Sequence, residues 1–194
     1  MEPSTNSEDL SFLLENLREI QDKISKATAQ SPSSQEVTLV AVSKTKSVEF
    51  IKYLFEHGQT HFGENYVDEF LEKQQLLDKD VKWHFIGHLQ SNKIPKILES
   101  NVHLLETVDS EKLAEKLHKG IISRNLSPLK VFLQVKMSGE ESKYGSVGVE
   151  NVISLAKRIK TQFTGLELKG LMCIGKEGDT SVFSQLSEIR TKVA

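Results

Sequence analysis

The stretch VTLVAVSKTKSVEFIKYLFEHGQTHFGEN, residues 37–65, decides the fold class. It opens with an apolar, β-branched run, Val37–Val42, which is typical of a strand buried on both faces. Apolar residues then recur with helical spacing over Ser47–Glu56, and Gly58 is well placed to end that helix. A second short strand is expected at His61–Phe62. A strand, a helix and a strand in close succession predict a β-α-β unit, whose two strands are parallel.

The same alternation of strand and helix continues along the chain. Four more strands are expected, at Trp83–Ile86, His103–Glu106, Leu129–Val135 and Leu166–Ile174. Helices are expected at Leu10–Ile24, Val67–Leu77, Lys93–Leu98, Ser110–His118, Val149–Phe163 and Ser181–Val193, with Ser110 as an N-cap. Six strand-then-helix units predict an α/β fold with a parallel sheet, and periodicity alone leaves open whether the sheet closes into a barrel. A (β/α)8 TIM barrel usually takes about 250 residues and at least about 200, so this chain would hold about six of its units.

Composition limits the possible partners. The 194 residues suit one domain, 1–194, and 38% hydrophobic with 27% charged residues is typical of a globular protein. The formal net charge of -2 gives no field that would attract nucleic acid or anionic lipid, so we expect neither as a partner. No stretch approaches the roughly 20 apolar residues that span a bilayer. The polar segment 1–9 resembles no signal or transit peptide, so we expect a flexible N-terminus and a cytoplasmic protein. The one cysteine, Cys173, fits a buried thiol in a reducing compartment.

Lys44 is the first candidate for chemistry, because parallel α/β folds bind ligands at the carboxyl ends of their strands. It comes directly after the first expected strand. A lysine drawn into a barrel mouth loses solvation, which favours the neutral amine that attacks an aldehyde. The alternative is a lysine that reaches to solvent or binds a phosphate. Lys46 is a weaker candidate for the same role.

Other polar residues leave their roles open. Asn65 could hydrogen-bond a ligand oxygen or cap a helix, and Glu64 could be a first-turn carboxylate favoured by the helix dipole. His84 and His88 have the spacing of zinc ligands on a helix, but they flank a strand end without a third ligand, so no metal site is expected. The segment 138–145 could cradle an anion or be a solvated loop. Motifs for dinucleotide binding, P-loop hydrolysis, serine hydrolases and zinc ribbons are absent from the sequence.

Six motifs in order resemble one family. They are LVAVSKTK (39–46), HFGENYVDE (61–69), KWHFIGHLQSNK (82–93), LLETVDS (104–110), SGEESKYG (138–145) and GLMCIG (170–175). Through them the chain resembles the YggS/PROSC family, which binds pyridoxal 5'-phosphate (PLP) and is similar in fold to the barrel domain of alanine racemase. The resemblance implies a single PLP-binding barrel domain.

The resemblance also implies the residues that hold the cofactor. They are Lys44 as the Schiff-base lysine, Asn65 near the cofactor ring, His84, Ile86 and Gly87 lining the pocket, and Met172 and Ile174 packing beneath it. Family members continue with a Ser-x-Gly-Met-Ser segment and an Arg-Ile-Gly turn that hold the phosphate and face the pyridine nitrogen. The chain stops at Ala194 without them. We therefore expect a partial sequence that lacks the last strands of the barrel.

The resemblance implies a function in PLP homeostasis, in which the protein buffers or delivers the cofactor without established catalytic turnover. We expect a monomer, with PLP-dependent apoenzymes as the recipients. An amino-acid racemase is one alternative, but it needs a base on each face of the substrate α-carbon. A PLP-independent lysine aldolase and a truncated fragment that binds no ligand are the others.

Overall fold

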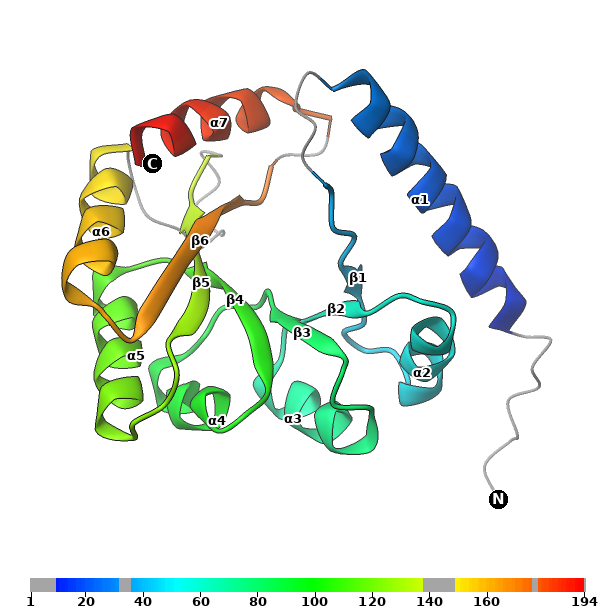
Figure 1. Ribbon diagram of the computed structural model, residues 1–194, viewed down its shortest axis with the longest axis horizontal. Helices are drawn as coiled ribbons and strands as arrows, with labels where there is room; N and C mark the ends of the chain where they lie inside the picture. Colours follow the sequence, from blue (N-terminus) through cyan, green and yellow to red (C-terminus); the bar gives the residue numbers. More distant parts are fainter. Residues whose placement is uncertain (1–9, 32–35, 138–148, 176–177, 194) are drawn as a thin grey trace.

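The computed structural model describes residues 10–31, 36–137, 149–175 and 178–193, and in these residues it forms one parallel six-stranded sheet (Figure 1). The strands are β1 (Ala41–Val42), β2 (His61–Glu64), β3 (Lys82–Phe85), β4 (Val102–Val108), β5 (Leu129–Val135) and β6 (Leu166–Cys173). Every neighbouring pair is parallel. The spatial order of the strands is the order of the chain.

This strand order answers the question that periodicity left open. In a doubly wound sheet the order reverses at a switch point, whereas a (β/α)8 barrel adds each new strand on the same side of the last one. Here the order runs from β1 to β6 without reversal. The predicted α/β barrel type with about six units is confirmed, and β1 and β6 are the two edges of the described sheet.

Helices cover the outer face of the curved sheet (Figure 1). They are α1 (Ser11–Gln30), α2 (Val48–Glu56), α3 (Val67–Leu76), α4 (Ile94–Leu98) preceded by a 3-10 turn (Ser91–Lys93), α5 (Glu111–Ser123), α6 (Val149–Gln162) and α7 (Ser181–Val193). The expected helices all form, and the Ser110 hydroxyl caps α5 by accepting a hydrogen bond from the backbone N–H of Leu113. Among the described residues, no helix is long and apolar enough to cross a membrane.

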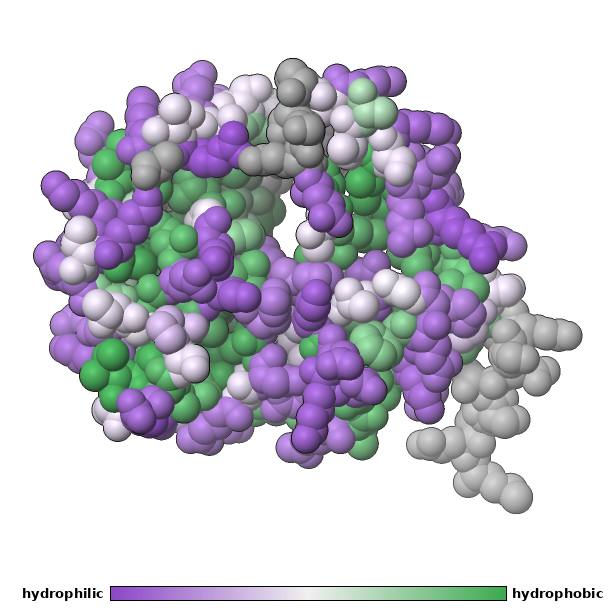
Figure 2. Space-filling model, in the orientation of Figure 1, coloured by the Kyte–Doolittle hydropathy of each residue, from purple (hydrophilic) through white to green (hydrophobic). Residues whose placement is uncertain are grey.

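The hydrophobic core lies between the sheet and these helices. Phe62, Trp83, Phe85 and Leu105 are buried there, one or two from each of three neighbouring strands. Because side chains alternate along a strand, the residues between them point to the opposite, inner face of the sheet. That face carries polar side chains, among them His84, and it borders the opening that Figure 2 shows between the β1 side and the β6 side of the molecule.

One prediction about the first strand was wrong. Only Ala41–Val42 of the run Val37–Val42 forms a strand, and neither end of the run is buried, since Val37 is 54% exposed and Val42 is 51% exposed. The reason is the position of β1 at the edge of the sheet, where β2 is its one strand neighbour. A β-branched apolar run indicates a preference for strand conformation, but it does not indicate whether the strand will have a neighbouring strand on each side.

Leu105→Ala should destabilise the protein because Leu105 is fully buried in the central strand β4. We expect the free energy of unfolding to fall by about 2–5 kcal/mol, measured by urea denaturation. Ile122→Ala on the exposed side of α5 is the matched control and should change it by less than about 0.5 kcal/mol. Equal losses in the two variants would contradict the assigned core.

Candidate functional site

Lys44 lies in a tight turn at the carboxyl end of β1. The backbone N–H of Ser43 donates to the Gly63 carbonyl of β2 at 2.9 Å, and the N–H of Lys46 donates back to the Ser43 carbonyl at 3.0 Å. Lys44 and Thr45 therefore occupy the centre of the turn. The Lys44 side chain is exposed, whereas Ser43 beside it is buried. The turn thus fixes the backbone of Lys44. The expectation that this lysine loses solvation was wrong, and its exposure matches the alternative of a lysine that reaches to solvent.

Thr45 adopts a backbone conformation that is unusual for its type. Its φ is 62°, in the left-handed region that β-branched residues rarely enter. Such a conformation costs on the order of 1–3 kcal/mol and persists only where surrounding contacts impose it. Here the backbone N–H of Thr45 donates to a carboxylate oxygen of Glu69 in α3 at 2.6 Å.

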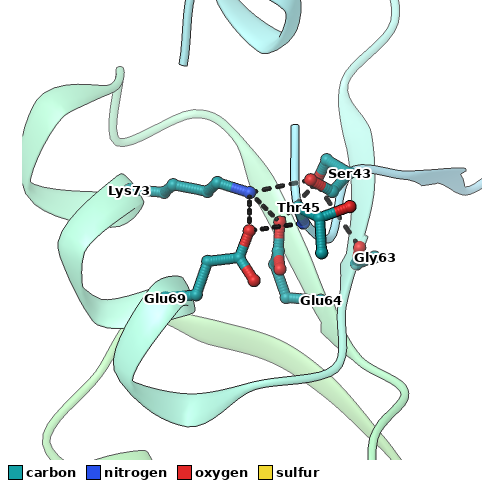
Figure 3. A network of polar contacts seen from close by, with 6 residues as sticks. All are labelled: Ser43, Thr45, Gly63, Glu64, Glu69 and Lys73. Carbon is teal, nitrogen blue, oxygen red and sulfur yellow. Dashed lines mark hydrogen bonds and ion pairs between the residues drawn. The ribbon is translucent and has the colours of Figure 1, made fainter. Parts of the chain in front are cut away.

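The contacts that hold this turn converge on one buried cation, Lys73 of α3 (Figure 3). Its Nζ donates to the Ser43 carbonyl at 2.7 Å, to Glu64 Oε1 at 2.7 Å and to Glu69 Oε1 at 2.6 Å. The Ser43 hydroxyl donates to the same Glu64 oxygen at 2.7 Å. The side chains of Lys73 and Glu64 are only 6% and 1% exposed. The end of β1, the end of β2 and helix α3 are thereby joined in one network.

The pKa of Glu64 is raised on balance, because burial outweighs the hydrogen bonds that this carboxylate accepts. Burial raises the pKa of Glu64, and the hydrogen bonds from Lys73 and Ser43 act in the opposite direction. Glu64 Oε2 has no hydrogen-bond partner among the described residues. Removing the ammonium would therefore leave two carboxylates facing each other with little water to screen them.

The sequence analysis missed this network. It considered Glu64 as a first-turn helix carboxylate, but Glu64 is the last residue of β2. Lys73 shares the buried face of α3 with Val67 and Phe70, at intervals of three residues. A charged residue at an apolar position of an amphipathic helix was the available signal, because a buried lysine requires a partner.

Asn65 and Gly87 bring the loops after β2 and β3 into contact. A Cβ atom on Gly87 would lie 1.9 Å from the backbone oxygen of Asn65, so glycine is required for this approach. The N–H of Ile86 donates to the Glu64 carbonyl at 2.8 Å. The side-chain Oδ1 of Asn65 is buried and has no hydrogen-bond partner among the described residues. Asn65 does not cap α3, whose N-cap residue is Tyr66.

A cavity of about 360 Å³ opens beside these two loops. Its lining includes Asn65, Gly87 and His88, at the carboxyl ends of β2 and β3. The unpartnered amide oxygen of Asn65 thus lies at a place where parallel α/β folds bind ligands.

His84 points to the inner face of the sheet and is held by protein partners. Its Nδ1 lies 2.5 Å from Glu106 Oε1, and its Nε2 lies 2.8 Å from Nδ1 of His61. The pKa of His61 is lowered to about 4, first by burial and then by electrostatic interaction with His84, Lys82 and His103. Burial also lowers the pKa of His103, with Lys130 as the next cause.

The remaining expected pocket residues lie at the other edge of the sheet. Met172 pairs with Gln134 on β5, and Ile174, just past the end of β6, is 45% exposed. The structure thus brings Lys44, Asn65, His84, Ile86 and Gly87 onto three neighbouring strands or the turns after them. Met172 and Ile174 are on or just past β6, three strands along the sheet from β3. The role of these two residues stays a prediction.

Three other expectations concern other parts of the chain. Cys173 is partly buried, and burial raises the pKa of its thiol. The expected anion-binding loop 138–145 lies outside the described residues, as does the expected flexible segment 1–9.

Lys73→Met should lower the free energy of unfolding by about 3–5 kcal/mol, because it leaves the buried Glu64 carboxylate uncompensated. Lys93→Met is the matched control. Lys93 pairs with Asp68 at the surface, and its loss should cost no more than about 1 kcal/mol. The double variant Lys73→Met/Glu64→Gln should recover part of the loss in a double-mutant cycle. Additive losses would contradict the assigned ion pair.

Gly87→Ala should destabilise the protein more than Gly63→Ala does. At Gly87 the new methyl group would meet the Asn65 backbone, which can yield only if the loop moves. At Gly63 it would meet the ends of the Ile86 and Val40 side chains at 3.1 and 3.3 Å, which can shift. We expect a loss of about 1–3 kcal/mol at Gly87 by thermal denaturation. A larger loss at Gly63 would be inconsistent with the contact between the two loops.

Comparison with known proteins shows the family of the chain. The family model for the alanine racemase N-terminal domain matches residues 9–192. The pyridoxal phosphate homeostasis protein of Schizosaccharomyces pombe is 42% identical over 176 residues, which cover 87% of this chain and 73% of that protein. The human protein of the same name is 42% identical over 173 residues, covering 84% of this chain and 62% of that protein.

Solved structures give the same result. The structure of PipY from Synechococcus elongatus PCC7942 with PLP bound is 30% identical, has a TM-score of 0.73, and is matched over 89% of this chain and 80% of its own. The chain spans less than two thirds of the length of the human relative and about three quarters of the yeast one. The family model matches nearly the whole chain, and the two homeostasis proteins are each 42% identical to it. The chain therefore belongs to the alanine racemase N-terminal domain family, and within it to the group of the pyridoxal phosphate homeostasis proteins.

Proposed function

We propose that this protein binds PLP covalently through Lys44 and serves in PLP homeostasis, as a carrier or buffer of the cofactor. One observation carries the proposal. The backbone on both sides of Lys44 is anchored to the buried Lys73 network, while the Lys44 amine itself is left exposed. Strained backbone such as that of Thr45 clusters at active sites and ligand sites, which supports a binding role for the neighbouring Lys44.

The residues at the carboxyl ends of β2 and β3 fit the cofactor. PLP supplies an aldehyde that forms a reversible covalent bond with an amine. The Asn65 amide, whose oxygen is buried without a partner, would hydrogen-bond a polar group of the ring. Gly87 leaves room for the loops to meet at this end of the sheet. Ile86 lies on the inner face, where its side chain reaches Gly63 of the adjacent strand.

The names of the relatives support the same function. Two of them are called pyridoxal phosphate homeostasis proteins, and the PipY structure is described with PLP bound. We propose that the present chain does the same in the cytoplasm, as a monomer, with PLP-dependent apoenzymes as the recipients.

We propose carriage rather than catalysis. A racemase needs a proton-transferring group on each face of the substrate α-carbon. His88 lines the candidate cavity and is paired with Asp109, and His84 on β3 has both ring nitrogens engaged by Glu106 and His61, so both are poorly placed to act as such a base. A racemase-like activity remains the second candidate because of the shared fold.

The test is to add PLP to the purified chain, remove the excess, reduce with borohydride and map the modified peptide. We expect a near-ultraviolet or visible chromophore and a pyridoxyl group on Lys44, both lost in Lys44→Ala. Lys46→Ala is the matched control, two residues away and also exposed, and should keep both signals.

Other outcomes would assign other functions. A chromophore that survives in Lys44→Ala would place the cofactor elsewhere. No retained chromophore in the wild-type chain would favour a lysine aldolase or a fragment without ligand, and racemisation of an added L-amino acid would favour the enzyme.

A further inference from the structure

Three histidines from three neighbouring strands meet on the inner face of the sheet. His61 is the first residue of β2, His84 is the third of β3, and His103 is the second of β4. One ring nitrogen from each lies within 4.8 Å of the other two. The ring centroids are 5.0 Å apart for His61 and His84, and 5.6 Å apart for each pair that includes His103. His84 is buried, and the other two are half-buried.

The register of the strands explains why these side chains meet. His61 is paired with Lys82 and Gly63 with His84, which puts both histidines on the face opposite to Phe62 and Trp83. Between β3 and β4 the register shifts by one residue, so that Trp83 pairs with Val102 but His84 pairs with Leu104. His103 is the extra residue of this bulge, and bulges commonly redirect a side chain.

Glu106 orients the central ring of the cluster. Its carboxylate accepts the Nδ1 proton of His84 at 2.5 Å, which leaves the lone pair of His84 on Nε2. That Nε2 faces Nδ1 of His61 at 2.8 Å, so the two nitrogens share one proton. A carboxylate on the far nitrogen of a histidine is the arrangement that surrounds histidine ligands of metal ions.

We propose that His61, His84 and His103 form a binding site for a divalent transition metal, with Zn²⁺ as the ion that best suits three imidazoles. The ion would take the place of the proton between His61 Nδ1 and His84 Nε2. That proton would move to Nε2 of His61, so both rings stay neutral and no proton is released. Tetrahedral Zn²⁺ with Zn–N bonds of about 2.0–2.1 Å needs ligand nitrogens about 3.3 Å apart. The His61–His84 pair therefore has to open slightly and His103 has to approach, both by side-chain rotation.

The charges around the cluster set its affinity. Lys82 and Lys130 lie close enough to act electrostatically on His61 and His103 and oppose a cation there. Glu106 supplies the compensating negative charge. No metal site was expected from the sequence, because His84 and His88 flank a strand end and no third ligand was found beside them. In the structure His88 instead lies 3.3 Å from Asp109, and the additional ligands come from strands on either side.

The test is a titration of the chain, without PLP, with Zn²⁺ by calorimetry and with Co²⁺ by visible absorption. We expect one ion per chain and the intense absorption of four-coordinate Co²⁺. His61→Gln and His103→Gln should each weaken Zn²⁺ binding at least about tenfold, and Glu106→Gln should weaken it about 10–100-fold. His57→Gln is the matched control, since His57 is exposed at the end of α2 and its ring is hydrogen-bonded to the backbone carbonyl of Tyr53.

Folding and binding are separated by the circular dichroism spectrum and melting temperature of each variant without metal. Variants that remain folded and bind Zn²⁺ as tightly as the wild type would overturn the proposal, as would equal weakening in His57→Gln. A wild-type chain that takes up no Zn²⁺, or that gives Co²⁺ only the weak absorption of a six-coordinate ion, would overturn it as well. PLP is absent throughout, so the result does not depend on the role of Lys44.

Discussion

The buried ammonium of Lys73 is the interaction on which the candidate site depends. β1 has only two residues in regular pairing and one strand neighbour, so backbone hydrogen bonds alone give it little support. Lys73 supplies what the sheet does not, because it binds the Ser43 carbonyl and the carboxylates of Glu64 and Glu69 at once. A buried cation is stable only with all its donors satisfied, so the geometry of the turn and the burial of Lys73 impose each other.

This constraint explains how the backbone of Lys44 is held in place although its side chain is exposed. Ser43 and Thr45, on either side of Lys44, each contact the network directly. The positive φ of Thr45 is held by Glu69 rather than by its own preference. Strain of this kind clusters at active sites and ligand sites.

The sheet and the turns after its strands carry two groups of polar residues. At the carboxyl ends of the strands lie Lys44 and Asn65, which the proposed function uses. Closer to the amino ends of the strands lie His61 and His103, together with the hydrogen-bonded pair of His84 and Glu106. Parallel strands produce such groups because residues at the same phase of successive strands face the same side. His84 connects the two, as it is followed by Ile86 and Gly87 in the loop that contacts Asn65.

The sequence by itself determined the type and order of the elements, the Ser110 cap of α5, and the position of Lys44 and Asn65 at strand ends. These follow from local periodicity and from turn and cap chemistry within a few residues. Only the tertiary structure decided that β1 is exposed, that Lys73 is shared by Glu64 and Glu69, and that His61, His84 and His103 meet. The physical reason is that these contacts depend on strand order, register and a bulge between β3 and β4, and no local pattern encodes which distant residues a side chain will face.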